Sequence, residues 1–165
     1  MDFQTKKDPA YRGKLTKVLV VSQNADLALK LEKGFISRML TRLTAALALK
    51  NVPVEVVQMN QSDLDPNSAV RTAAERFRPE ELLYIALTRV NTQTVTRGNP
   101  GLPSTSAYIP QGPMVMVDSI TISYSLQDRQ SGKMVWRGEA LFDPPPHPED
   151  IADRLLKQLE AEDFF

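Results

Sequence analysis

The sequence predicts a single-domain α/β sandwich: a mixed, mostly antiparallel sheet in the order β-α-β-α-β-β-β-α, with helices packed on one face. Two observations carry this prediction. Apolar and polar residues alternate over residues 116–126 and again over 133–142, and the short polar link 128–132 between them predicts a long β-hairpin. Before the hairpin, short β-branched runs alternate with helical patterns, which is typical of strand–helix–strand units. A length of 165 residues fits one domain with its own core.

The first elements of the chain are a tail, a strand and a helix. Residues 1–14 are polar, so we expect a flexible tail there and the folded domain over residues 15–165. Residues 17–22 form a β-branched apolar run, which predicts a strand buried on both faces. From residue 26 to residue 49 apolar positions recur at steps of three and four, which predicts a long amphipathic helix, with Gly34 as its weakest point.

The middle of the chain continues the alternation of strands and helices. Residues 54–59 predict the second strand and residues 68–77 a short helix. The apolar run 82–87 predicts a central strand that continues toward Val90 or Val95.

The rest of the chain holds a loop, the hairpin and a last helix. The Pro/Gly-rich segment 97–113 is the longest loop in the sequence, and the hairpin follows it. The proline-rich segment 143–148 predicts an extended connector, and residues 148–162 a final amphipathic helix.

No set of catalytic or metal-binding residues is evident. The chain has no cysteine, which excludes disulfides, thiolate metal sites and cysteine nucleophiles. His147 is the only histidine, so we expect a capping or surface role for it. Asp63 and Asp65 have a spacing that suits a hard cation but is more typical of a helix entrance. We therefore expect no enzyme, no catalytic residues, no metal and no cofactor.

Charge is distributed unevenly along the chain. The net charge is zero, but residues 1–112 hold 15 Lys/Arg and 10 Asp/Glu, whereas residues 113–165 hold 5 and 10. A solvated helix face accounts for the basic excess better than a polyanion site, so we expect no nucleic acid as partner.

Two segments are the best candidates for binding a partner. A compact domain rarely keeps a long Pro/Gly-rich loop unless the loop has a function, and segment 97–113 contains Tyr108 and Ile109. The outward face of the predicted hairpin adds Val135, Arg137 and Glu139 opposite a row of hydroxyl side chains. We expect Tyr108, Ile109 and Arg137 to contact a protein partner.

The run 17–21, the helix after it, the strands at 54 and 82–87, and the turn Asp128-x-x-x-Gly132-Lys133-x-Val135-Trp136 together resemble bacterial envelope lipoprotein domains related to the N-terminal domain of TolB. Penicillin-binding-protein activator lipoproteins and the curli-secretion lipoprotein carry domains of this kind. The resemblance implies an α/β sandwich in the periplasm or at the outer membrane that binds other envelope proteins and has no catalytic residues.

These observations favour a non-enzymatic envelope adaptor or assembly factor. Any membrane tether would come from residues outside this chain, and exposed edge strands would allow homo-oligomers. The alternative is a cytoplasmic nucleic-acid or nucleotide-binding module that uses the basic N-terminal half, which would follow if the chain truly begins at Met1. An enzyme built on Asp63, Asp65 and Arg71 is the least favoured hypothesis.

Overall fold

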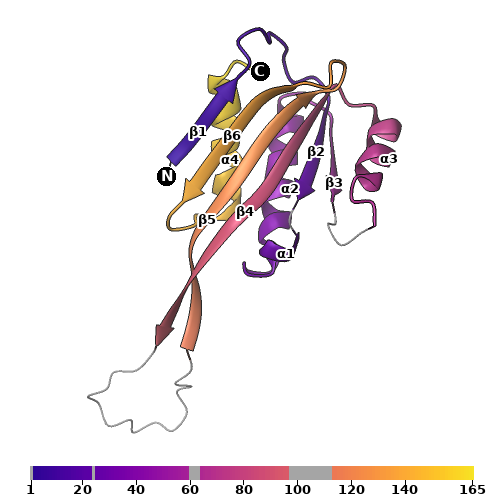
Figure 1. Ribbon diagram of the computed structural model, residues 1–165. Helices are drawn as coiled ribbons and strands as arrows, with labels where there is room; N and C mark the ends of the chain where they lie inside the picture. The colour runs from indigo at the N-terminus through magenta and orange to yellow at the C-terminus, as the bar shows by residue number, and fades with distance from the viewer. Residues whose placement is uncertain (1, 24, 60–63, 97–112) are drawn as a thin grey trace, which may run out of the picture.

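Six strands form one open, mixed sheet in a computed structural model that describes residues 2–23, 25–59, 64–96 and 113–165 (Figure 1). The order across the sheet is β1-β6-β5-β4-β2-β3. The strands in these residues are β1 Asp2–Lys7, β2 Val18–Gln23, β3 Val54–Gln58, β4 Glu81–Thr96, β5 Pro113–Asp128 and β6 Met134–Phe142. The helices are α1 Ala25–Ala28, α2 Phe35–Leu49, α3 Ser68–Phe77 and α4 Pro148–Ala161.

Antiparallel pairing dominates the sheet, which confirms the predicted mixed α/β fold. The neighbours β1–β6, β6–β5 and β5–β4 are antiparallel, whereas β4–β2 and β2–β3 are parallel. Parallel neighbours need a crossover connection, and the helical segments between β2, β3 and β4 provide it.

The main core lies between the sheet and the two longest helices. Helices α2 and α4 cover one face, where they pack on inward residues of β2, β4, β5 and β6 (Figure 1). Along β2, Val18 and Val20 face this core, whereas Leu19 and Val21 face a second, smaller one. Strand β2 is thus buried on both faces, as its continuous apolar run predicts.

Helix α3 departs from the expectation that the helices pack on one face. Its Val70 and Ala73 pack with Leu19 and Val21 in the second core, on the side opposite α2 and α4. The chain moves outward from β2 to β3 through α2 and then back across β2 to β4 through α3. Because parallel crossovers are right-handed, reversing the direction of travel puts the second helix on the other face.

The long helix expected over residues 26–49 is broken into α1 and α2. Gly34 precedes α2 with φ 83°, a left-handed conformation that glycine adopts without a steric penalty. The break turns the chain so that Phe35, the first residue of α2, is buried in the main core.

The prediction of a flexible tail over residues 1–14 is wrong for Asp2–Lys7, which form strand β1. Asp2–Lys7 pairs along its whole length with β6, with Phe3 opposite Ala140. The Phe3 ring stacks on Tyr124 at 5.7 Å between centroids, and Thr5 donates a 2.7 Å hydrogen bond to Glu162. These contacts join the two ends of the chain, which is why local sequence did not reveal the strand.

Strands β4 and β5 extend together well beyond the rest of the sheet (Figure 1). Their pairing shifts register between Leu87 and Arg89 and again between Asn91 and Thr92. Such irregularities increase the local twist of a ribbon. We call residues 91–96 with residues 113–117 the arm.

Candidate protein-interaction surfaces

The side of β1, β6 and β5 that points away from α2 and α4 is the first candidate surface, and we call it the open face. Alternation places polar side chains on it, because the apolar positions of the same strands point into the main core. Two hollows lie on this face, and the larger has a volume of about 590 Å³. Side chains contributing to the two hollows include Gln4, Lys6, Thr121, Ser123, Ser125, Arg137 and Glu139.

Arg137 is exposed on the open face, as its position in the hairpin predicts. Together with Lys6 it lines both the larger hollow and a neighbouring one between β1 and β6. Glu139 lies two residues further along β6 and accepts a 3.4 Å hydrogen bond from the Ser123 hydroxyl. Met134 is exposed and lines the same two hollows as Lys6 and Arg137, so it adds an apolar side chain to both.

The expectation that Val135 lies on the outward face of the hairpin is wrong. Its side chain is buried, with 3% exposure. Leu126 pairs with Trp136 but Gln127 pairs with Met134, so β6 has one extra residue at this point. A bulge of this kind interrupts the strict alternation of sides. Val135 and Trp136 are therefore both buried, and the residues from Trp136 onward follow the predicted parity.

The other two expected contact residues, Tyr108 and Ile109, lie outside the described residues. The described strands nearest to that segment form the arm, which is the second candidate surface. Four of its apolar side chains are exposed: Val95 by 37%, Met114 by 41%, Val115 by 65% and Met116 by 49%. The arm contains no Asp, Glu, Lys or Arg.

A groove of about 440 Å³ lies at the root of the arm. Its lining includes Leu31, Phe35 and Val117 together with the proline-rich connector before α4. His147 lines the groove from the N-cap position of α4, with an exposed side chain that makes no capping hydrogen bond. His147 is therefore a surface residue, as one of the two expectations had it, but its side chain does not cap α4.

Asp65 and Arg71 occupy a helix entrance. Asp65 accepts a hydrogen bond from the backbone N–H of Asn67 and forms an ion pair with Arg71. These contacts tie down the turn before α3, as expected for an acidic residue at that position. Asp63 lies outside the described residues, and the described parts of the chain contain no group of acidic residues and histidine that could hold a metal ion.

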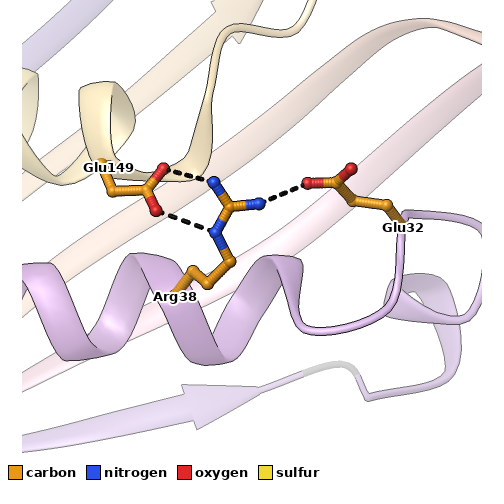
Figure 2. Close-up of polar contacts among 3 residues, drawn as sticks. All are labelled: Glu32, Arg38 and Glu149. Atoms are coloured by element: carbon orange, nitrogen blue, oxygen red, sulfur yellow. Dashed lines mark hydrogen bonds and ion pairs between the residues drawn. The ribbon is translucent and has the colours of Figure 1, made fainter.

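The basic residues of α2 face acidic residues of α4. Figure 2 shows Arg38 between two carboxylates: its Nε and Nη2 donate to Glu149 at 2.8 and 3.0 Å, and its Nη1 donates to Glu32 at 2.8 Å. The hydrogen bonds from Arg38 lower the pKa of Glu149, and those to Glu149 raise the pKa of Arg38. A guanidinium in this fork geometry is already engaged by carboxylates.

The same pattern repeats along the two helices. Arg42 donates to Asp153 at 2.8 Å, and Lys50 forms an ion pair with Glu160. Three of the basic residues that gave the N-terminal half its excess charge thus pair with the acidic C-terminal helix. The basic and acidic halves of the sequence thus meet through three ion pairs at one helix–helix interface.

Comparison with known proteins identifies no family. No family model and no curated protein match the sequence. Among solved structures, the chain is similar in outline to the PelC dodecamer from Paraburkholderia phytofirmans, with 14% identity, a TM-score of 0.46, and coverage of 92% of this chain and 90% of that one.

Two further solved structures show a similar course of the chain. Lipoprotein GNA1162 from Neisseria meningitidis is 14% identical with a TM-score of 0.43, over 89% of this chain and 96% of that one. The hypothetical protein CT253 from Chlamydia trachomatis is 13% identical with a TM-score of 0.39, over 78% and 73%. The similar structures thus include a bacterial lipoprotein. Among the described residues, no helix is long and apolar enough to span a membrane.

Proposed function

We propose that this protein is a non-enzymatic adaptor or assembly factor of the bacterial envelope that binds another protein on its open face. The observation that carries the proposal is the contrast between the two faces of the sheet. One face is buried under α2 and α4, whereas the other presents hollows that combine Arg137 and Lys6 with Met134. Arginine and methionine are enriched at protein interfaces relative to the remaining surface.

The charge of the open face defines the chemistry of the partner. Lys6 and Arg137 lie opposite each other on β1 and β6 and line two adjoining hollows, whereas Glu139, two residues further along β6, accepts a hydrogen bond from Ser123. An arginine side chain binds a carboxylate through two parallel hydrogen bonds. The partner is therefore a protein surface that presents acidic side chains to β1 and β6.

The envelope location rests on the sequence resemblance to lipoprotein domains related to the N-terminal domain of TolB. The absence of enzymatic activity is supported by a sequence with one histidine and no cysteine. Fractionation of native cells tests the location. We expect the protein in the membrane or periplasmic fraction, and recovery from the cytosol alone would overturn this part of the proposal.

Site-specific crosslinking tests the open face. A photo-crosslinking residue at Ser125 is compared with one at Lys157, an exposed residue on α4. We expect a discrete adduct with an acidic protein from Ser125 and none from Lys157. The double variant Lys6→Glu/Arg137→Glu should abolish the adduct, whereas Lys157→Glu should preserve it. An adduct that survives the reversal of both charges would contradict the proposal.

A further inference from the structure

The arm is a two-stranded ribbon whose outer edges have no partner in the described sheet. Strand β6 pairs with β5 only from Ile120 to Gln127, and β2 pairs with β4 only from Glu81 to Ala86. Beyond these limits β4 and β5 pair with each other alone. An isolated two-stranded ribbon is marginally stable in water, and it needs a third strand or a packed surface for independent stability.

Between Pro113 at its tip and Asp118 at its root, the β5 edge of the arm lacks the features that keep edge strands apart. Natural proteins protect exposed edges with lysine, proline or inward-pointing charges. The run 114–117 is Met-Val-Met-Val, in which the first three side chains are 41–65% exposed. A strand edge that is uncharged, apolar and exposed is a template for pairing with another strand.

The other unpaired edges of the described sheet are polar or charged, and the β4 edge of the arm is polar through Thr92, Gln93 and Thr94. Strand β1 carries Asp2, Lys6 and Lys7, and β3 carries Glu55. Charged residues on those edges oppose pairing with an apolar strand. Within this chain, the uncharged run 114–117 is therefore matched best by the same run of a second copy.

We propose that two copies of this protein pair through β5 of the arm, antiparallel and about a two-fold axis near Val115. The result is a four-stranded sheet in the order β4-β5-β5-β4. Its two central strands bring the Met-Val runs together, and the outer strands carry polar Thr92, Gln93 and Thr94. Like charges directly opposite each other destabilise a strand pair, and the arm has none. A two-fold interface of this kind uses the same patch on both copies.

Mass measurement in solution tests the pairing. We expect the purified protein to be a dimer whose dissociation rises on dilution. The variant Val115→Lys puts two like charges near the axis, and it should weaken the dimer about tenfold or more. Ser131→Lys, in the exposed β5–β6 turn, is the matched control and should leave the dimer intact. Circular dichroism should show that both variants keep the fold, because Val115 lies outside the two cores.

Crosslinking tests the register, since the chain has no native cysteine. Residues opposite each other in an antiparallel pair have Cα atoms about 4.5–5.5 Å apart, which is within reach of a disulfide. Val115→Cys alone, or Met114→Cys combined with Met116→Cys, should form a disulfide-linked dimer on mild oxidation, whereas Ser131→Cys should not. A monomeric wild type, or a dimer crosslinked through Thr94→Cys but through neither β5 position, would overturn the proposal. These results do not depend on Arg137, so they are separate from the test of the open face.

Discussion

Tyr124 illustrates the cost of a polar atom in the core of this sheet. Its side chain is 2% exposed, and burial raises the pKa of its hydroxyl. The hydroxyl has no hydrogen-bond partner among the described residues. Tyr124→Phe removes the buried oxygen but keeps the ring that stacks on Phe3, so the free energy of unfolding should rise by about 1 kcal/mol.

Urea denaturation measures this change, with Tyr84→Phe as the matched control. The Tyr84 hydroxyl donates a 3.4 Å hydrogen bond to Gln127, so its removal should lower stability slightly or leave it unchanged. A clear loss of stability in Tyr124→Phe would show that its hydroxyl is hydrogen-bonded in solution, contrary to the prediction.

Glu81 makes stability depend on pH. It is 3% exposed at the start of β4, and burial raises its pKa, although hydrogen bonds from the backbone N–H groups of Thr16 and Lys17 oppose that rise. A raised pKa in the folded state means that the contribution of Glu81 is fully present below the pKa of the unfolded chain, about 4.3. That contribution is lost as the pH rises through the folded-state pKa.

Glu81→Gln isolates this effect because glutamine does not ionise. Between about pH 4 and pH 7, the variant should gain stability relative to the wild type as the pH rises. Unfolding free energies measured across this range provide the check. Parallel pH profiles for the two proteins would refute the prediction.

At the scale of elements, strand β1 contributes to the stability of the fold through contacts with residues far away in the sequence. Phe3 lies opposite Ala140 and stacks on Tyr124, so Phe3→Ala should lower the free energy of unfolding by about 2 kcal/mol. It should also speed amide hydrogen exchange in β6. Gln4→Ala, the adjacent residue on the open face, is the control and should change neither quantity appreciably. Equal effects of the two substitutions would show that β1 is not anchored by its inward side.

Sequence patterns predicted the strands well where the periodicity was strong. They failed where a strand or the side of a residue depends on contacts that are distant in the sequence. The continuous apolar run of β2 and the alternation of the β5–β6 hairpin indicated their strands and the exposure of Arg137. Strand β1 has one large apolar residue, Phe3, which lies opposite Ala140 of β6, more than 130 residues away. The buried position of Val135 follows from a bulge, and a bulge depends on pairing with β5 that one strand alone does not reveal.

At the scale of the whole molecule, the fold brings basic residues of the N-terminal half against the acidic last helix. The topology lays α4 beside α2, where Arg38 meets Glu149 (Figure 2). Along the same interface Arg42 and Lys50 meet Asp153 and Glu160. Composition alone shows the asymmetry but not its cancellation, because the cancellation requires residues more than 100 positions apart to become neighbours. Three of the basic residues of the N-terminal half, which suggested a nucleic-acid partner, are thus paired with the last helix.

Removing the acidic partners should expose that latent basic surface. In Glu149→Gln/Asp153→Asn/Glu160→Gln, Arg38 and Arg42 of α2 and the adjacent Lys50 lose their α4 carboxylates while side-chain size is kept. The variant should bind heparin or duplex DNA with an affinity that falls steeply with salt, since such binding releases counterions. The wild type should show little binding at physiological salt, and Asp143→Asn, an exposed acidic residue before the α4 connector, should behave like it. Salt-dependent binding by the wild type itself would instead support the nucleic-acid alternative, because it would mean that the paired cations remain available to a polyanion.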